Sequence, residues 1–540
     1  MVTTIETPVL IVGAGPVGLA LALDLNHKGT ESLVVEQDAG TAQVMLAKAG
    51  TLNERTMEFC RRWGLVEEVA KHFPADYPRD NVYCTSLTGH LIGRSPVPST
   101  NERDVPTAGP EMMRRCAQHL FDPILADAVK ASEHASIRYG TRFEGFVQDD
   151  EGVISTLTEL DTGKIITVRS QYLVGCDGAG SQVRKKLAVP FDLITQMDFS
   201  LSAMLKISHL EKYHGFGKCE RFMFIDSNGT WANMTTNDGV DYWRFTVVGS
   251  EEALNPETFD IHPLVRRAFG DADVPYEVVR MVPWRRAQTL ARTYRVGRVL
   301  LAGDSTHTTS PTGGHGLNTS IGDATGAAWI LDAMVKGWGG EQLLESYTVE
   351  RRPVATRNFS SSTQNYRAWV GGGMANVDKD TPEGAAARRN VGNHLKSSLH
   401  QEWFSQGIGM GYSYGDSPII VPDGTPMPVD HPSFYLQTAR PGHRAPHAWL
   451  TDGRSTLDLF GRGFVLLRFG GKTPDVSPLL NAACKRGMPL TLVDIDQPEI
   501  AVLYERRLVL VRPDGMVAWR SDCLPGDFIA LVDHVRGETV

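Results

Sequence analysis

The sequence feature that most constrains the fold is a glycine turn close to the start of the chain. Residues 9–12 are apolar and run into the pattern Gly13-x-Gly15-x-x-Gly18, which is followed by apolar residues at helical spacing. In a strand, turn and helix of this kind, Gly13 makes the tight turn, Gly15 lets the backbone approach a pyrophosphate, and Gly18 allows helix and strand to pack closely. The helix N-terminus, with Pro16 in its first turn, presents N–H groups and a positive dipole end to phosphate. The turn therefore predicts a dinucleotide site.

A second apolar strand strengthens this prediction. Residues 32–35 are followed by Glu36 and Gln37. In dinucleotide-binding folds, a carboxylate at the end of the second strand accepts hydrogen bonds from the adenosine ribose. Glu36 therefore favours a bound dinucleotide over a strand, turn and helix without a ligand.

Length, charge and cysteine usage limit the function classes. A chain of 540 residues is too long to fold around a single hydrophobic core, so its length predicts two or three domains. The net charge is -9 and no long basic run occurs, so we expect no nucleic-acid partner. The seven cysteines form no zinc-type spacing, which predicts no metal site and a reduced, cytoplasmic environment. Glycines and Pro16 interrupt the apolar residues 9–23, so we expect neither a membrane span nor an export signal.

Two further turns combine glycine with an acid. Residues 172–175 form an apolar strand that is followed by Asp177, and residues 298–302 lead into Gly303 and Asp304. Open α/β sheets bind ligands at the carboxyl ends of their strands. We therefore expect both carboxylates at the edge that carries the first glycine turn.

Large side chains alternate with smaller ones over residues 221–225, 231–235 and 242–246. This period of two predicts an antiparallel sheet inserted into the first fold, with one face free to cover a pocket. Only one face of each strand can do so, and about half of the large side chains are therefore expected to be core. The candidates for an aromatic substrate pocket are Met223, Trp231, Tyr242, Trp243 and Arg244.

The last part of the chain is a separate α/β unit. Apolar runs at 464–467, 490–493 and 508–511 predict its strands. It contains no CxxC pair, so thiol redox chemistry is not expected there. Before it, residues 370–395 combine three glycines with mixed charge and are interpreted as a loop or linker between helices.

The glycine and acid elements, in this order, resemble the class A FAD-dependent aromatic hydroxylases, which are single-component flavoprotein monooxygenases. The resemblance is to the phenol-type members with a thioredoxin-like C-terminal domain, and it covers nearly the full length. It implies an α/β fold with a Rossmann-like FAD-binding domain, an inserted antiparallel β-sheet substrate domain and a C-terminal thioredoxin-like α/β domain. The matching elements are Gly13, Gly15 and Gly18 with Glu36, Asp177 with Gly178, and Gly303 with Asp304.

The resemblance also implies domain boundaries. The FAD-binding domain is expected at residues 1–80, 106–190 and 281–360. The substrate domain is expected at residues 81–105 and 191–280. Residues 361–414 would form a helical or linker region, and residues 415–540 the thioredoxin-like domain.

The same resemblance implies how FAD is held. Lys48 stands where the family usually has arginine, and a lysine cannot bind phosphate bidentately. Asp304 is expected to accept hydrogen bonds from the ribityl hydroxyls, and Asp177 to lie near the pyrophosphate or the ribityl chain. The expected FAD contacts are Gly13, Gly15, Pro16, Gly18, Glu36, Gln37, Lys48, Arg55, Gln118, Asp177, Gly303, Asp304, Pro311, Gly314, Gly316, Leu317 and Asn318.

The stretch 311–318 opens a long helix and is assigned to the flavin ring. Backbone that is poor in side chains at a helix start offers N–H donors and positive dipole, which would stabilise negative charge on a reduced flavin. A turn that only starts the helix is the alternative. His307 and His315 could titrate beside the flavin, although such histidines are more often structural. The expected catalytic residues are Pro311, Gly314, His315 and Gly316.

The function that the resemblance implies is hydroxylation of a phenolic or other small aromatic substrate with O2 and NADH or NADPH, through a flavin C4a-hydroperoxide. Gly50 stands where some phenol hydroxylases carry a substrate-deprotonating aspartate, so that route is excluded and no general base is assigned. A tailoring oxygenase of a polycyclic aromatic polyketide is the alternative within redox chemistry. A non-catalytic flavin-binding protein is the alternative of another class. The family also implies a homodimer.

Overall fold

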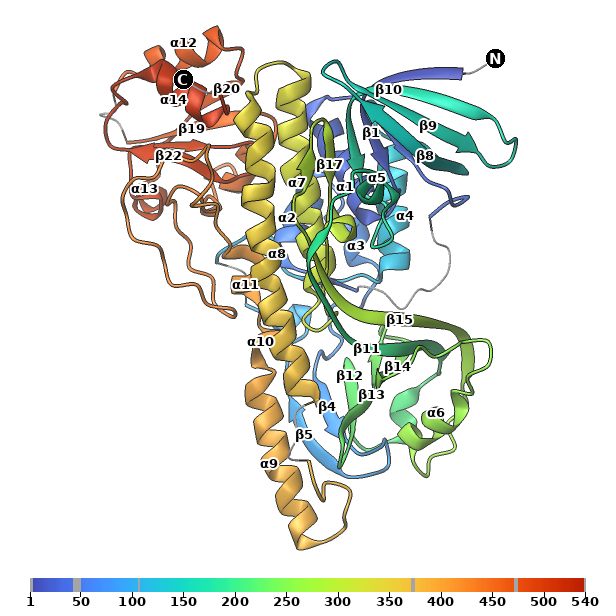
Figure 1. Ribbon diagram of the computed structural model, residues 1–540. Coiled ribbons are helices and arrows are strands. Elements are labelled where there is room, and N and C mark those ends of the chain that lie inside the picture. Colours follow the sequence, from blue (N-terminus) through green and yellow to red (C-terminus); the bar gives the residue numbers. More distant parts are fainter. Residues whose placement is uncertain (1–2, 42–49, 105–106, 371–373, 471–473, 539–540) are drawn as a thin grey trace.

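The computed structural model describes residues 3–41, 50–104, 107–370, 374–470 and 474–538 (Figure 1). Its strands form two eight-stranded sheets, a four-stranded sheet and one short pair. In Figure 1 the first sheet lies at the upper right, the second at the lower right and the C-terminal unit at the upper left. The long helices α7 (His315–Val335) and α8 (Glu341–Val370) run between them.

The first sheet is the Rossmann-like unit that the sequence predicts. Its order is β16-β17-β10-β1-β2-β7, with β9 on β10 and β8 on β9. The strands β1, β2, β10 and β17 run parallel, so their carboxyl ends meet at one edge. Helix α1 packs against α7 and α4. The elements are β1 (Thr3–Val12), α1 (Pro16–Lys28), β2 (Ser32–Val35), α4 (Gln118–Lys130), β7 (Ala135–Arg138), β8 (Thr141–Gln148), β9 (Val153–Glu159), β10 (Ile165–Gly175), α5 (Gln182–Lys186), β16 (Arg295–Val296) and β17 (Val299–Leu301).

The second sheet has the order β18-β15-β11-β14-β13-β12-β4-β5. It is antiparallel except where β4 lies parallel to β12, and the excursion after residue 80 supplies the two strands at one edge, β4 and β5. Two long strands, β11 and β15, connect this sheet to the first unit. The elements are β4 (Asn81–Cys84), β5 (Leu91–Ser95), β11 (Phe191–Lys206), β12 (Arg221–Asp226), β13 (Gly229–Thr236), β14 (Tyr242–Ser250), α6 (His262–Phe269), β15 (Glu277–Ala291) and β18 (His307–Thr308).

The two faces of the second sheet differ in composition. The outer face packs Phe222, Phe224 and Phe245 against α6 in one apolar cluster. The opposite face, which we call the inner face, turns toward α8, because Met223 lies in a cluster with Trp369 of that helix. Strand pairing places polar side chains on the inner face, among them Asp198, Ser202, Asn233, Arg244, Thr246 and Arg286.

The segment expected to be a linker at 370–395 is helical over much of its length, so that prediction is wrong. Helix α9 (Pro382–Ser398) begins with Pro382 in its first turn and with the Thr381 side chain as N-cap, accepting from the Gly384 N–H. These two signals start a helix despite the mixed charge that follows. Further elements are β3 (Thr51–Leu52), α2 (Glu54–Arg62), α3 (Val66–Ala70), β6 (Arg114–Arg115), α10 (His400–Trp403) and α11 (Gln406–Met410).

The C-terminal unit is the thioredoxin-like α/β domain, with strand order β20-β19-β21-β22. Phe464 packs edge-on against Trp329 of α7 at 6.1 Å between ring centroids. The buried guanidinium of Arg512 donates to both carboxylate oxygens of Glu350 on α8, at 2.6 and 2.8 Å. The unit is therefore attached to the two central helices. Its elements are β19 (Phe464–Phe469), α12 (Ser477–Lys485), β20 (Leu490–Ile495), α13 (Pro498–Tyr504), β21 (Leu508–Val511), β22 (Val517–Ser521) and α14 (Phe528–Val535).

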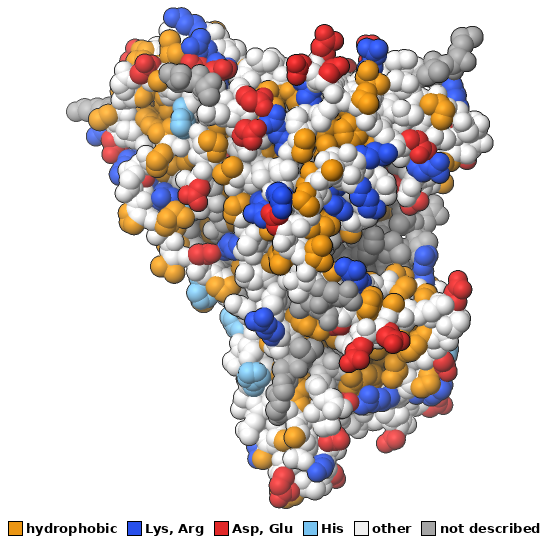
Figure 2. Space-filling view, viewed as in Figure 1, with side chains coloured by type: hydrophobic (Ala, Val, Ile, Leu, Met, Phe, Trp, Pro, Cys, Tyr) orange, Lys and Arg blue, Asp and Glu red, His pale blue; other side chains and the backbone are white. Residues whose placement is uncertain are grey.

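Within residues 3–41, 50–104, 107–370, 374–470 and 474–538, no helix combines the length and apolarity needed to cross a bilayer. The same ranges contain no group of three or more His, Cys, Asp or Glu side chains suited to a metal ion. Figure 2 shows acidic and basic side chains interspersed over the visible face.

Candidate FAD and substrate site

Each glycine of the first turn has a distinct steric environment. Gly13 has φ +108°, and a Cβ there would lie 2.5 Å from the carbonyl oxygen of Cys176. A Cβ on Gly18 would overlap the carbonyl oxygen of Gly13. A Cβ on Gly15 would meet nothing within 4 Å, and Gly15 is also the N-cap of α1, directly before Pro16. Gly13 and Gly18 are thus fixed by internal packing, while the face of Gly15 is open to a ligand.

Glu36 lies at the carboxyl end of β2, beside this turn. Its carboxylate accepts from the Ala14 N–H at 2.8 Å and from the Asp38 N–H at 3.1 Å. Each oxygen keeps a lone pair for a further donor such as a ribose hydroxyl. Gln37 follows on the exposed side of the strand end.

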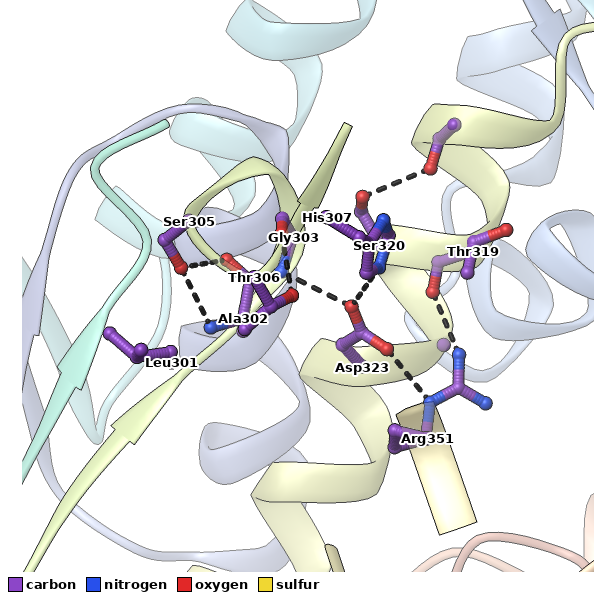
Figure 3. Close-up of polar contacts among 12 residues, drawn as sticks. Leu301, Ala302, Gly303, Ser305, Thr306, His307, Thr319, Ser320, Asp323 and Arg351 are labelled. Atoms are coloured by element: carbon purple, nitrogen blue, oxygen red, sulfur yellow. Dashed lines mark hydrogen bonds and ion pairs between the residues drawn. The ribbon is translucent and has the colours of Figure 1, made fainter. Parts of the chain in front are cut away.

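Gly303 and Asp304 follow β17 at the same edge, and a buried ionic group holds their turn (Figure 3). The Gly303 N–H donates to Oδ2 of Asp323 at 3.1 Å. The carboxylate of Asp323 also binds Nε2 of His307 and Nε of Arg351, each at 2.8 Å. Asp304 itself is exposed. We call the glycine turn 13–18, Glu36 and the turn 303–304 the ligand edge.

Burial disfavours the charged form of Asp323, but the adjacent His307 and Arg351 outweigh burial and lower its pKa below the ordinary value. Asp323 comes from α7 and Arg351 from α8, so the group ties both helices to the ligand edge. Sequence reasoning assigned no role to either residue. The available signal was a charged residue at position 323 in a helix stretch that is otherwise small and apolar.

Asp177 lies beside the glycine turn, where its carboxylate caps α5. It accepts from Oγ of Ser181 at 2.5 Å and from the N–H groups of Gln182 and Val183 at 2.6 and 3.1 Å. These hydrogen bonds give the Asp177 carboxylate a structural role, because they cap the N-terminus of α5. A contact of Asp177 with FAD stays a prediction.

The loop assigned to the flavin ring leads into α7. Gly313 and Gly314 have φ +92° and +66°, and Gly314 is the N-cap. A Cβ on Gly313 would lie 2.5 Å from Nε2 of His315. Pro311 is exposed, whereas Gly316 and Leu317 are half-buried in the first helical turn. The loop thus presents backbone, and glycine is required at two successive positions.

His315 is buried beneath this loop. Burial, together with the charge of Arg357, lowers its pKa to about 4. Its Nε2 lies 3.4 Å from Oγ of Ser361 on α8. His315 is therefore neutral at pH 7, and His307 is engaged with Asp323, so both histidines have structural partners.

Asn318 fastens the start of α7 to neighbouring segments. Its Oδ1 accepts from the Asn53 N–H and from Oγ1 of Thr56, and its Nδ2 donates to the carbonyls of Thr51 and Gly314, all at 2.7 to 2.9 Å. The side chain is thus occupied within the protein, which leaves its backbone as the part that could contact FAD.

The remaining expected FAD contacts lie farther along the first unit. The buried Arg55 donates to Glu58 at 2.9 Å and to the carbonyl of Asp514 at 2.8 Å, which links α2 to the C-terminal unit. Gln118 begins α4 and donates to Asp122 at 3.2 Å. Lys48 lies outside the described residues.

The substrate-pocket candidates fall on both faces of the second sheet. Met223 and Arg244 are on the inner face, and Tyr242 is half-buried at the start of β14. Trp243 is buried in the outer cluster. Trp231 also packs against that cluster, because a register shift between β12 and β13 turns it toward Phe224, 5.7 Å away between ring centroids.

Trp243 is therefore one of the side chains expected to be core, and a substrate contact of any of the other candidates stays a prediction. Large apolar rings gain more from the α6 core, and the alternation then places polar neighbours on the inner face. Arg244 is one of these. Burial and the charges of Arg115 and Arg221 lower its pKa to about 9, while Glu220 acts in the opposite direction.

Family comparisons agree with this geometry. The family model described as FAD binding domain matches residues 6–362, and the model described as Aromatic-ring hydroxylase, C-terminal matches residues 438–537. The chain belongs to the FAD-dependent aromatic-ring hydroxylases. This hydroxylase is 32% identical to tetracenomycin B2 monooxygenase-dioxygenase of Streptomyces olivaceus, over 98% of both chains. It is 30% identical to 2,4-dichlorophenol 6-monooxygenase of Delftia acidovorans, over 96% of this chain and 95% of that one.

Solved structures extend the comparison to the whole fold. The rebeccamycin biosynthetic enzyme RebC with bound 7-carboxy-K252c is 39% identical, with a TM-score of 0.91, covering 99% of this hydroxylase and 100% of that chain. A ternary complex of aklavinone-11 hydroxylase with FAD and aklavinone is 27% identical, with a TM-score of 0.80, covering 98% and 99%. The family resemblance and the fold class are confirmed, as are FAD as the cofactor and O2 as a reactant.

The residues of the ligand edge fit FAD. Gly15 leaves open space at a helix N-terminus, and Glu36 and the Gly303 turn stand at neighbouring strand ends. An open backbone face at a helix start suits a pyrophosphate, and carboxylates suit sugar and ribityl hydroxyls. The hydroxylase therefore binds FAD; the individual contacts are predictions.

Proposed function

We propose that this hydroxylase inserts one oxygen atom of O2 into a phenolic ring, with NADH or NADPH as reductant. The observation that carries the proposal is the double role of α7. Its Asp323 holds the Gly303 turn of the ligand edge, and its N-terminus carries the glycine loop 313–314. One rigid helix thus connects the part that fits the ribityl chain to the part assigned to the flavin ring.

The residues at the start of α7 supply electrostatics rather than acid–base chemistry. FAD, once reduced, provides the O2 chemistry. The backbone N–H groups and dipole at the helix start would stabilise negative charge on the reduced ring. Because His315 is neutral at pH 7, it adds no full charge there. No general base is assigned, and Gly50 leaves the position of the phenol-type aspartate without a carboxylate.

The alternative substrate is a polycyclic aromatic polyketide. It is favoured by the tetracenomycin relative and by the aklavinone complex, whose ligand is named in the structure's title. The dichlorophenol relative favours a single ring. Both substrates require the same insertion of oxygen into an electron-rich ring.

The decisive experiment measures NAD(P)H oxidation by the purified holoenzyme with simple phenols, hydroxybenzoates and polycyclic quinones. We expect stimulation by at least one aromatic compound, together with a product heavier by one oxygen atom. Stimulation by a polycyclic compound alone would select the tailoring reaction. A yellow protein that no aromatic compound stimulates would instead be the non-catalytic flavoprotein.

We also propose that the enzyme is a cytoplasmic homodimer. The pKa values of buried thiols such as Cys60 and Cys84 are raised by burial, which suits inert, reduced cysteines. Light scattering of the purified holoenzyme measures its mass in solution and so tests the dimer. A mass of one chain at micromolar concentration would refute it.

A further inference from the structure

The C-terminal unit lies across α7 and α8 from the first sheet, yet a series of buried side chains leads from it to the ligand edge (Figure 1). The series begins in the segment 412–421, which is bound to the C-terminal unit by its backbone. The Tyr414 N–H donates to the carbonyl of Gly442 at 2.7 Å, and the Val421 N–H donates to the carbonyl of Ala518 on β22 at 2.9 Å. Tyr414 therefore belongs structurally to the C-terminal unit.

The ring of Tyr414 packs on Arg512, which lies directly after β21. The guanidinium carbon of Arg512 is 5.3 Å from the centroid of that ring and 4.7 Å from the centroid of Trp329 on α7. The nitrogens of Arg512 donate to Glu350 of α8 and to Asp514 at 2.6 to 3.1 Å. A buried arginine with this many partners has one favoured position, so it fixes the tyrosine ring against both central helices.

The hydroxyl of Tyr414 binds the arginine of the ionic group behind the ligand edge. It accepts from Nη1 of Arg351 at 2.8 Å. The other two nitrogens of Arg351 have partners on α7, because Nε donates to Asp323 at 2.8 Å and Nη2 to the carbonyl of Thr319 at 2.9 Å. A Cβ on Gly322 would lie 2.7 Å from Nη2, so the guanidinium fits closely against that helix. Tyr414 is thus the partner that the C-terminal unit supplies.

Two more bonds lead from Arg351 to the ligand edge (Figure 3). Asp323 accepts from Arg351 through Oδ1 and from the Gly303 N–H, at 3.1 Å, through Oδ2. Without the Tyr414 hydroxyl, Nη1 would be a buried donor with no acceptor. Because such a donor is costly, the guanidinium would shift to regain an acceptor, and the carboxylate that it orients would shift with it.

We propose that the C-terminal unit is part of the FAD site, and that Tyr414 is the positioning residue through which it acts. Tyr414 holds Arg351, which keeps the Asp323 carboxylate aligned with the turn at Gly303, and this alignment slows the release of FAD. Burial raises the pKa of Tyr414 well above its ordinary value, so its hydroxyl is neutral at pH 7. The inference concerns retention of the cofactor and does not depend on the aromatic substrate or the reductant.

The test is Tyr414→Phe in the full-length holoenzyme, a change that removes a hydrogen-bond acceptor without removing a charge. The holoenzyme is diluted into buffer without FAD, and ultrafiltration at successive times separates the released FAD, which is measured by its absorbance. The equilibrium reached at several protein concentrations gives the Kd. We expect release about tenfold faster than in the wild type and a Kd about tenfold higher. Wild-type release would overturn the proposal.

Tyr504→Phe is the matched control. The buried hydroxyl of Tyr504 donates to the carbonyl of Pro446 at 2.7 Å, so this variant also loses one buried hydrogen bond of the C-terminal unit. That bond has no connection to Arg351, and we expect wild-type release of FAD. If Tyr504→Phe accelerated release as much as Tyr414→Phe does, general loosening of the unit would explain both results and the proposal would fail.

A double-mutant cycle tests whether Tyr414 acts through the ionic group. In the Asp323→Asn background the path to Gly303 is already broken, so adding Tyr414→Phe should accelerate release by less than about twofold. Arg351→Lys is a second background, because a lysine cannot keep the three partners of the guanidinium. If the effects of the two substitutions multiplied in both backgrounds, Tyr414 would act independently of Arg351 and Asp323, and the proposed path would be refuted.

Discussion

The ligand edge of the first sheet and the inner face of the second sheet form the site by opposite means. The ligand edge uses backbone: Gly13, Gly15 and Gly18 create space, and main-chain N–H groups of the turns bond to Glu36 and Asp323. The inner face uses side chains, such as Arg244 and Arg286, presented by strands that bury their rings on the other side. A backbone site tolerates no added atoms, whereas a side-chain site can change its chemistry without changing the fold.

The largest effect should come from replacing, one at a time, two glycines of the same turn. Gly18→Ala places a methyl group on the carbonyl oxygen of Gly13 and should cost more than about 5 kcal/mol of folding free energy or prevent folding. Gly15→Ala meets no protein atom, so it should fold normally but bind FAD at least about tenfold more weakly. Thermal unfolding and FAD titration measure the two effects. A Gly18→Ala protein of wild-type stability would break the comparison.

The next test replaces, one at a time, two adjacent residues whose side chains lie on opposite faces of β14. Trp243→Ala empties the outer core and should lower the free energy of unfolding by about 3–5 kcal/mol, with little change in KM. Arg244→Gln should have the reverse profile, with a raised KM for the aromatic substrate and nearly unchanged stability. Urea unfolding and steady-state kinetics provide both numbers. Arg244→Gln with an unchanged KM would remove that residue from the substrate region.

A third test breaks the buried ionic group behind the ligand edge. Asp323→Asn leaves Arg351 and His307 without their carboxylate and should cost about 3 kcal/mol of stability. It should also weaken FAD binding, because the Gly303 turn loses its anchor. Asp127→Asn, which breaks an exposed pair with Lys130 on α4, is the control and should change neither quantity measurably. Retained FAD affinity in Asp323→Asn would limit the group to a structural role.

The smallest effect is the contribution of one buried histidine, His315, to the pH dependence of stability. Burial lowers the pKa of four histidines to about 4, so between about pH 6.5 and pH 4 the unfolded chain binds more protons than the folded one. Stability should therefore decrease as pH falls through this range. These residues are His27, His315, His443 and His447.

Urea midpoints at pH 7 and pH 5 measure this loss. His315→Gln should reduce it, whereas exposed His394→Gln should leave it unchanged. A wild-type pH response in His315→Gln would show that His315 already titrates normally.

How far the sequence could predict the site depended on the range of the interactions involved. The role of Gly18 follows from a local pattern, because its contact is the carbonyl of Gly13 in the same turn, whereas the contact of Gly13 is the carbonyl of Cys176, which follows another strand. The partner of Asp323 could not be predicted, because Arg351 lies on another helix 28 residues away. The packing of Trp231 could not be predicted either, because a register shift, which periodicity does not reveal, turns it toward Arg267 of α6.

The sequence by itself determined the fold class, the family and the FAD-binding turn, because these rest on spacings of a few residues that backbone geometry enforces. Only the tertiary structure decided which face of the second sheet is polar, how Asp323 joins α7 and α8 to the ligand edge, and how Tyr414 connects the C-terminal unit to Arg351. Those features depend on side chains from separate strands and helices, whose meeting is set by packing and register rather than by local order along the chain.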